Sequence, residues 1–289
     1  MIEWKQELLS KHTTFRIGGP ADYYMVPESK EEVIQAIHFA TDNQMPFYIL
    51  GKGSNVLFSD EGYRGVVIEI GKGMADYSME DGRVKVAAGL SMSTMAQKLA
   101  EAGYTGFEFA SGIPGTLGGG IAMNAGAYGG EMKDCIVSAT VLDDKGDVVT
   151  LAADELELGY RTSVIQKKKY IVLEAEFFFE QGDVGTIRQT MKELNGRRRE
   201  KQPLEYPSAG STFKRPEGYF AGKLIQDAGL RGYQVGDAQV SEKHCGFVVN
   251  KGNATAKDVL QLIEDVKAKV WDEFQVELEP EVRVIPEQG

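Results

Sequence analysis

Glycines crowd the stretch ASGIPGTLGGGIAMNAGAYGG, residues 110 to 130, in a pattern that suits phosphate binding. Glycine reaches positive φ and lets a ligand approach the main chain closely. Clustered backbone N–H groups form a nest for anions such as a pyrophosphate. A flexible linker is the alternative, but linkers are polar and serine-rich, whereas this stretch is interleaved with apolar residues. We predict an ordered, ligand-contacting loop whose eight glycines are Gly112, Gly115, Gly118, Gly119, Gly120, Gly126, Gly129 and Gly130.

A second candidate phosphate loop, GKGSNVLFSD, spans residues 51 to 60 and follows a predicted buried strand. Gly51 and Gly53 begin a Rossmann-like pattern, but Val56 occupies the third glycine position and no helical periodicity follows. The loop does not match Walker A either. Its chemistry still suits a pyrophosphate, and a generic turn is the alternative. Its polar members beside the glycines are Lys52, Ser54 and Asn55.

Arginines at two further places could contact anions. Arg16 lies in KHTTFRIGGP, where the alternative is a strand that ends in a turn. Three arginines, residues 197 to 199, end a predicted helix, which suits the negative end of the helix dipole. We expect two of these three to be simply solvated.

Composition restricts the classes of function. The chain has 289 residues, which suits two domains or one domain with a lobe, and a net charge of −11 argues against nucleic acid as the main partner. No apolar run is long enough to span a membrane, and the N-terminus lacks the features of a signal peptide. Two cysteines, Cys135 and Cys245, indicate a reducing compartment, so we expect a cytoplasmic protein. The histidines are too scattered to suggest a metal site.

Hydrophobic periodicity predicts a mixed chain of helices and strands. A domain junction is expected near Lys201, before Pro203 and Pro207. Residues 276 to 285 alternate, but Pro280 reduces them to an edge or irregular strand. Strands are expected over 21–26, 47–50, 65–70, 83–88, 136–142, 148–151, 170–180 and 246–250. Helices are expected to open at Ser29 and to span 91–102, 183–200, 220–228 and 255–274.

Six motifs together carry a resemblance to a known family. HTTFRIGG, GKGSNVL, GIPGTLGGGIAMNAGAYG, GYRTS, SAGSTFKRP and LEPEVR occur in this order from about residue 11 to residue 285. Each is weak alone, but their combination resembles the UDP-N-acetylenolpyruvoylglucosamine reductases, the MurB flavoenzymes of peptidoglycan precursor synthesis. The resemblance covers nearly the whole chain.

The resemblance implies an α+β fold. An FAD-binding domain similar to the PCMH and vanillyl-alcohol-oxidase flavoproteins is expected over residues 1–200, with subdomains of about 1–85 and 86–200. A smaller α+β substrate-binding domain is expected over 201–289, with its last strand returning to the active site. Such proteins hold FAD without a Rossmann fingerprint, which agrees with the interrupted glycine pattern after Gly51.

The same resemblance implies non-covalent FAD and NADPH as reductant. The two glycine loops match the flavin contacts of the family. The residues implied to bind FAD are Gly51, Lys52, Gly53, Ser54, Asn55, Val56, Gly112, Ile113, Pro114, Gly115, Thr116, Gly118, Gly119 and Ala122.

The implied reaction reduces UDP-N-acetylglucosamine enolpyruvate to UDP-N-acetylmuramate. Arg161 matches the arginine that binds the substrate carboxylate, where a guanidinium fork suits an enolate. Ser211 matches the proton donor, and Glu281 matches an acidic residue at the reacting carbon. A serine hydroxyl is a poor acid, so nearby positive charge must help it. The residues implied to bind substrate are Tyr160, Asn124, Lys201 and Lys214.

Each of these roles has a non-catalytic alternative. Arg161 could form a surface ion pair, Ser211 could be only a turn residue, and Glu281 could be a solvated glutamate. At the level of function, the alternatives are another flavoprotein oxidoreductase of the same fold and a non-catalytic sugar-nucleotide binding protein. A covalent flavin is disfavoured because no histidine or cysteine lies in or just before the GIPGTLGGG loop.

The chain departs from the longer form of the family. The path from Tyr170 to Ser211 has no room for the inserted tyrosine-bearing loop of that form, so the chain resembles the shorter type II form. No tyrosine lid of that kind is therefore expected over the substrate. Arg215 also stands where the longer form has asparagine, so sugar-nucleotide contacts are expected to differ.

Overall fold

The computed structural model describes residues 1–286, and these residues form two compact units. Unit 1 contains Met1–Trp4, Tyr24–Lys52 and Val66–Arg198, and unit 2 contains Lys5–Tyr23, Gly53–Gly65 and the chain from Arg199 onward. The chain thus leaves unit 1 close to the junction expected near Lys201. Two N-terminal segments, however, belong with the C-terminal part of the chain.

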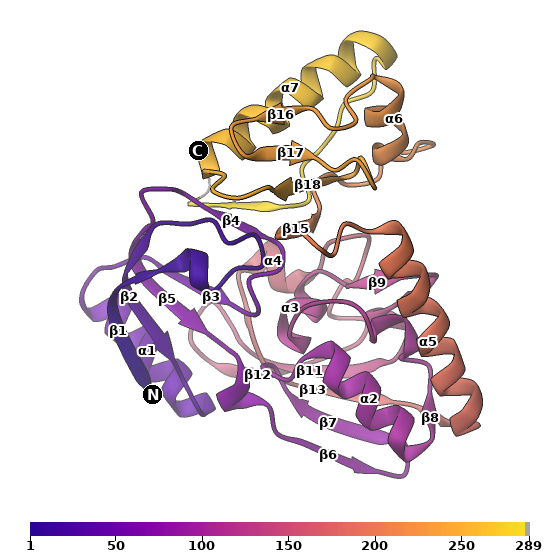
Figure 1. Ribbon diagram of the computed structural model, residues 1–289. Coiled ribbons are helices and arrows are strands. Elements are labelled where there is room, and N and C mark those ends of the chain that lie inside the picture. Colours follow the sequence, from indigo (N-terminus) through magenta and orange to yellow (C-terminus); the bar gives the residue numbers. More distant parts are fainter. Residues whose placement is uncertain (287–289) are drawn as a thin grey trace. The chain divides into compact units, whose positions relative to one another are not determined.

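A five-stranded antiparallel sheet forms the centre of unit 1 (Figure 1). Inward and outward side chains alternate along its strands, as in β7, where Val84 and Val86 are buried and Arg83 and Lys85 are exposed. Helix α2 (Met92–Ala102) contributes Met95 to the same core. The strands, in sheet order, are β12 (Val148–Ala152), β11 (Ile136–Leu142), β13 (Ile171–Phe178), β7 (Arg83–Ala87) and β6 (Tyr77–Glu80).

Helix starts follow the capping residues that the sequence predicts. Ser29 caps α1 (Lys30–Asp42), its hydroxyl accepting from the N–H of Glu32 at 3.2 Å. Ser91 caps α2 in the same way, and Gly103 ends that helix at a φ of 78°. The predicted helix from residue 183 is α5 (Val184–Lys201).

The middle of the glycine-rich stretch is a helix, where we expected only loop. Helix α3 (Leu117–Ala122) contains three consecutive glycines. Thr116 caps it, accepting from the N–H of Gly119 at 3.4 Å. The missing side chains allow close packing, since a Cβ on Gly120 would lie 2.7 Å from the sulfur of Met92. Tertiary packing therefore outweighs the poor helix propensity of glycine.

Another sheet contains the N-terminal strands, in the order β1-β2-β5-β3. β3 runs parallel to β5, and the boundaries between the units fall inside β1, β2 and β5. The bounds are β1 (Ile2–Leu8), β2 (Pro20–Val26), β5 (Tyr63–Glu69) and β3 (Phe47–Leu50). The shorter elements of unit 1 are β8 (Tyr104–Thr105), β9 (Gly126–Ala127), β10 (Gly130–Glu131), α4 (Val164–Lys168) and β14 (Glu180–Gln181).

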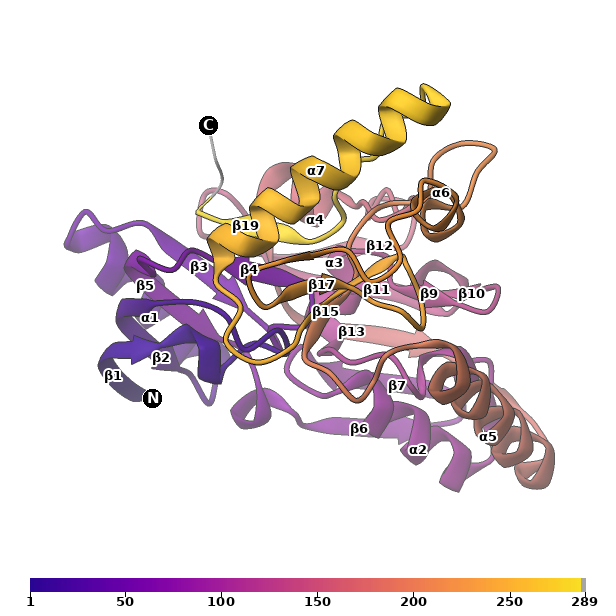
Figure 2. The ribbon, with the colours of Figure 1, turned by 45° about the horizontal axis from the view of Figure 1, so that its top comes forward.

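Unit 2 has a four-stranded antiparallel sheet with a helical cover. Helix α7 (Ala256–Phe274), seen along its length in Figure 2, packs against β16 and β17 (Figure 1), and its buried face includes Val259 and Val266. A capping box between Thr255 and Asp258 starts this helix. In order, the strands are β15 (Ser208–Ser211), β18 (Phe247–Asn250), β17 (Ala238–Val240) and β16 (Gln234–Val235), and α6 (Ala221–Asp227) packs against α7.

The C-terminal segment is mostly irregular, as Pro280 led us to expect. Only β19 (Arg283–Ile285) is a strand, and it pairs in parallel with β4 (Val56–Phe58). No helix among residues 1–286 is long and apolar enough to cross a membrane.

Candidate active site

Unit 1 brings the two predicted phosphate loops together. Gly51 follows β3, and a Cβ built on it would lie 2.5 Å from the hydroxyl of Thr116. The backbone after Thr116 is fixed in turn, since the N–H of Gly118 donates to the carbonyl of Ala88 at 2.9 Å. Glycine at position 51 is thus required for the close approach of these two segments.

Gly112 contacts the C-terminal half of α5. A Cβ there would lie 2.4 Å from Oδ1 of Asn195, whose amide donates to the hydroxyl of Ser111 at 3.0 Å. The side chain of Arg198 lies beside the same glycine, and burial lowers its pKa, although an arginine remains charged at neutral pH. Its neighbours at 197 and 199 are exposed. Arg198 is therefore the member of the basic run that is placed near a glycine loop.

Unit 2 fixes the rest of the GKGSN loop against the HTTFRIGG motif. A Cβ on Gly53 would lie 2.1 Å from the carbonyl oxygen of His12, and the φ of Gly53 is +61°. The N–H of Thr14 donates to the carbonyl of Gly53 at 3.0 Å, and its hydroxyl donates to the carbonyl of Ser208 at 2.7 Å. Arg16 is exposed with a φ of +57°.

The remaining predicted FAD residues fall into different surroundings. Ile113 and Ser54 are half-buried, and Lys52 and Pro114 are exposed. Val56 lies in β4, paired with Arg283. A Cβ on Gly119 would find no atom closer than 3.6 Å, so the main chain there is open. The open main chain at Gly119, between loops that Gly51 and Gly112 allow to pack closely, fits a cofactor that is held through its phosphates.

Ser211 and Glu281 are neighbours within unit 2. Ser211 ends β15, where the ladder to β18 is irregular and Gly210 has a φ of +77°. The next residue, Thr212, accepts at its carbonyl from the N–H of Glu281 at 2.8 Å. The hydroxyl of Thr212 accepts from the N–H of Val248 at 2.9 Å. The segment from Ser211 is thus held between β18 and the C-terminal segment.

Asn55 joins the GKGSN loop to the same place. Its side-chain amide donates to the carbonyl of Glu281 at 3.0 Å, and its own carbonyl accepts from the N–H of Arg283 at 3.0 Å. One motif residue therefore fixes the backbone on both sides of Val282. With the bonds of Thr14 described above, unit 2 assembles residues from four of the six motifs.

The two predicted lysines lie in different surroundings. Lys214 forms an ion pair with Glu279, and its N–H donates to the carbonyl of Glu279 at 2.8 Å. Lys201 is exposed at the last residue of α5. The guanidinium carbon of Arg215 lies 4.0 Å from the centre of the Phe220 ring.

Arg161 and Tyr160 occupy the tip of a tight turn in unit 1. Gly159 and Thr162 exchange main-chain hydrogen bonds of 3.1 and 3.3 Å, and Arg161 has a φ of +55°. Tyr160 is 52% exposed, and the guanidinium of Arg161 lies 5.4 Å from the centre of its ring. The arginine also donates to the carbonyl of Gly126 at 3.5 Å.

Asn124 is buried, with 1% of its surface exposed. Its amide donates to the carbonyl of Gly159 and to Glu131, and its Oδ1 accepts from the N–H of Lys133. The predicted FAD residue Ala122 accepts at its carbonyl from the side chain of Gln166 at 2.6 Å. Our sequence reasoning missed Glu131 and Gln166. The Ser-x-x-Gln spacing before α4 resembles a capping box and was the available signal for Gln166.

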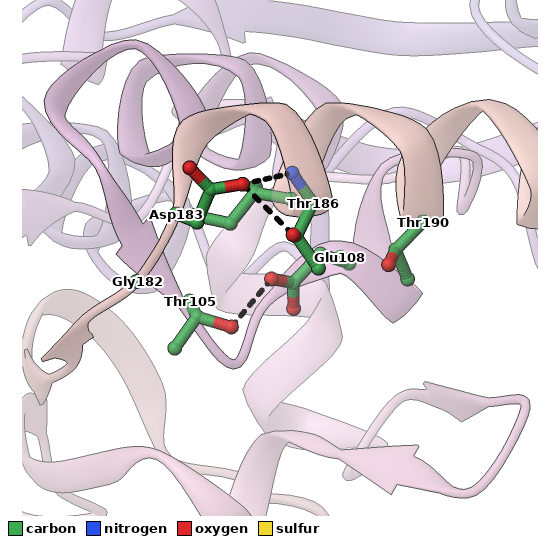
Figure 3. Close-up of a pocket in the computed structure, with 7 residues that line it drawn as sticks. Thr105, Glu108, Gly182, Asp183, Thr186 and Thr190 are labelled. Atoms are coloured by element: carbon green, nitrogen blue, oxygen red, sulfur yellow. Dashed lines mark hydrogen bonds between the residues drawn. The ribbon is translucent and has the colours of Figure 1, made fainter.

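A separate cavity of about 350 Å³ lies at the start of α5 (Figure 3). Asp183 accepts from the N–H and hydroxyl of Thr186, both at 2.8 Å, and Glu108 accepts from the hydroxyl of Thr105 at 2.7 Å. Its acids are thus engaged by their neighbours, and none of the predicted site residues lines it. Within residues 1–286, no group of three or more His, Cys, Asp or Glu residues could hold a metal ion.

Comparisons with known proteins define the class first. Residues 21–152 match the family model described as FAD binding domain. A crystal structure of the UDP-N-acetylenolpyruvylglucosamine reductase (MurB) from Thermus caldophilus is similar over 98% of both chains, with a TM-score of 0.85 and 36% identity. The chain is therefore an FAD-dependent oxidoreductase with an α+β FAD-binding fold.

The particular family follows from the rest of the chain. Residues 202–285 match the C-terminal domain model of UDP-N-acetylenolpyruvoylglucosamine reductase. Reductases of that name from Lachnoclostridium phytofermentans and Agathobacter rectalis are 57% and 55% identical, over 98% of this chain and 92% and 94% of theirs. The chain belongs to the UDP-N-acetylenolpyruvoylglucosamine reductase family. It uses FAD and NADPH and reduces its small-molecule substrate in peptidoglycan precursor synthesis.

Proposed function

We propose a role in this reaction for each of the predicted site residues. Arg161, with Tyr160, binds the enolpyruvyl carboxylate of UDP-N-acetylglucosamine enolpyruvate, and Ser211 and Glu281 govern proton delivery to the α-carbon. The glycine loops hold FAD. When bound, FAD carries hydride from NADPH to the enolpyruvyl double bond. In this proposal residues up to about 200 serve mainly FAD, with Arg161 and Tyr160 as substrate contacts, and residues from 201 onward serve the substrate.

Arg161 supplies the charge that the reaction needs at the carboxylate. Hydride addition to the methylene carbon leaves negative charge that spreads from the α-carbon into the carboxylate. A guanidinium binds such a planar oxyanion with two parallel hydrogen bonds and gains strength as the charge grows. An arginine at a φ of +55° is unusual, because this region favours glycine and asparagine. Strained residues of this kind cluster at functional sites, which supports the role.

Ser211 supplies the proton in this proposal. Its placement is supported by the bond from Glu281 N–H to the carbonyl of Thr212 and by the amide of Asn55 on the carbonyl of Glu281. These bonds, between motifs far apart in the sequence, are the observation that carries the proposal. Since Lys214 is paired with Glu279, its positive charge is partly neutralised until substrate competes for it.

The substrate and its location complete the proposal. NADPH and the enolpyruvyl sugar nucleotide are both anionic, so they suit the basic residues placed near the loops despite the net charge of −11. We place the reaction in the cytoplasm. Both cysteines are free and buried, and burial raises the pKa of Cys135 to about 12, as suits a structural thiol in a reducing compartment.

Ser211→Ala tests the proposed proton donor. We expect flavin reduction by NADPH to stay within about twofold of the wild type. Reoxidation by substrate is expected to slow by at least about 10²-fold, a typical contribution of a positioned acid. Anaerobic stopped-flow absorbance measures the two half-reactions separately. Ser208→Ala in the same strand is the control and is expected to behave as wild type. Equal losses in both half-reactions would remove the proton-donor role.

A further inference from the structure

The turn that carries Arg161 is held in a conformation that its own sequence disfavours. Arg161 is the third residue of the four-residue turn from Gly159 to Thr162, and its φ is +55°. Turns with positive φ at this position favour glycine or asparagine. An arginine persists there only when its surroundings hold the backbone in place.

Asn124 provides such a hold from inside the protein. Its Nδ2 donates to the carbonyl of Gly159 at 3.1 Å, at the first residue of the turn. The same nitrogen donates to Oε2 of Glu131 at 2.9 Å, and Oδ1 accepts from the N–H of Lys133 at 3.0 Å. Both N–H bonds and the oxygen are engaged, and the side chain is 1% exposed. The amide is therefore committed to the fold.

Glu131 accepts a hydrogen bond from Asn124 and also interacts electrostatically with Arg161. Its carboxylate lies 2.9 Å from Nζ of Lys133. The hydrogen bond from Lys133 lowers the pKa of Glu131, and burial opposes this effect. The hydrogen bond from Asn124 and the positive charge of Arg161 lower the pKa further. Glu131 is thus charged at neutral pH, and its negative charge attracts the guanidinium.

The far side of the turn is tied to the same loop. Gln166 donates from Nε2 to the carbonyl of Ala122 at 2.6 Å and to the carbonyl of Arg161 at 3.5 Å. Ser163, which caps α4, donates from its hydroxyl to the carbonyl of Ala122 at 2.6 Å. Segment 122–131 is therefore hydrogen-bonded to the first residue of the turn, through Asn124, and to the residues that follow the turn, through the carbonyl of Ala122.

We propose that Asn124 and Glu131 are positioning residues for Arg161, acting through the Gly159–Thr162 turn and not by touching the substrate. The inference rests on the proposed role of Arg161 at the substrate carboxylate. It assigns Asn124 a different task from the direct substrate contact expected from the sequence.

A double-mutant cycle on the FAD-loaded enzyme tests this proposal. Asn124→Ala and Arg161→Ala are made singly and together, and reoxidation of the reduced enzyme by enolpyruvyl-UDP-N-acetylglucosamine is followed in the stopped flow. We expect Asn124→Ala to slow reoxidation at least tenfold, with NADPH reduction and flavin content within twofold of wild type. In the Arg161→Ala background, the same change is expected to add less than twofold, because the residue acts through the arginine.

Variants of Glu131 keep the test decisive if Asn124→Ala does not fold. Glu131 is partly exposed, so Glu131→Ala is expected to fold and to slow reoxidation at least tenfold. Glu131→Gln keeps an oxygen acceptor for Asn124 and is expected to recover most of that loss. Normal reoxidation in both the Asn124→Ala and Glu131→Ala enzymes, or multiplicative losses in the cycle, would overturn the positioning role alone. Normal reoxidation in Arg161→Ala would instead overturn the role of the arginine, and the inference with it.

Discussion

At the scale of single residues, mutation of Glu281 distinguishes a catalytic glutamate from a merely solvated one. It is one of three alternating glutamates, and unlike exposed Glu277 its backbone is fixed by Thr212 and Asn55. We expect Glu281→Gln to slow reoxidation by substrate at least about 10²-fold while NADPH reduction continues. Glu277→Gln is the matched control and is expected to turn over normally. Normal steady-state turnover in Glu281→Gln would show that this glutamate is solvated and has no catalytic role.

Gly115 tests the fit of the glycine loop to FAD. It is buried at a φ of 151°, and its carbonyl accepts from the N–H of Met92 at 3.1 Å. A valine there would displace the backbone, so we expect Gly115→Val to be purified with little or no FAD.

Gly146→Val is the matched control for this change. Gly146 also has positive φ, at 86°, but lies in the β11–β12 turn with open space around it. This variant carries a similar backbone strain and is expected to remain yellow. A stoichiometric flavin spectrum in Gly115→Val would contradict the assignment of the loop.

At the scale of elements, the meeting of Gly51 with Thr116 predicts coupling between two loops. Thr116→Ala is expected to cost about 1 kcal/mol through the lost cap of α3. Gly51→Ala places a methyl group 2.5 Å from the Thr116 hydroxyl, and removing that hydroxyl relieves the clash. We therefore expect the double variant to be more stable than the sum of the single changes, by about 0.5–3 kcal/mol. Denaturant unfolding gives the free energy of unfolding of each variant. Strictly additive changes would show that the two loops are not coupled through this contact.

Local signals in the sequence predicted most elements, because caps and periodicity act within a few residues. Ser29, Ser91 and Thr255 mark helix starts as expected. Helix α3 was hidden, because its stability comes from close packing against Met92 and not from the propensity of its glycines. The role of Glu131 was hidden for a related reason, since its partner Asn124 makes its other donor bond to Gly159, 35 residues further along the chain.

At the scale of the whole molecule, each unit has its own core. The core of unit 2 includes Phe15, Ile17 and Leu57 beside residues of α6 and α7. Pro203 and Pro207, which follow the helix of residues 183–200, led us to expect a junction near Lys201, but the sequence could not show that segments 5–23 and 53–65 pack with the C-terminal part. Such pairing depends on contacts between segments far apart in sequence.

A fragment of residues 199–289 tests this arrangement. It lacks the three N-terminal core side chains, each worth about 1.5–3 kcal/mol when buried, and β19 loses its partner β4. Because whole domains are stable by only about 5–15 kcal/mol, we expect the fragment to show no cooperative thermal transition by circular dichroism. The full chain is the comparison. A cooperative melt of the fragment would mean that the C-terminal part folds alone.

Reduction of the enolpyruvyl sugar nucleotide by a flavin-loaded chain is tested most directly in one cuvette. The purified protein is placed under anaerobic conditions, and its visible absorbance is recorded after NADPH and again after enolpyruvyl-UDP-N-acetylglucosamine. We expect a flavin band that bleaches with NADPH and returns with the sugar nucleotide. A band that bleaches and does not return would contradict the substrate, and a colourless protein that cannot be reconstituted with FAD would contradict the cofactor.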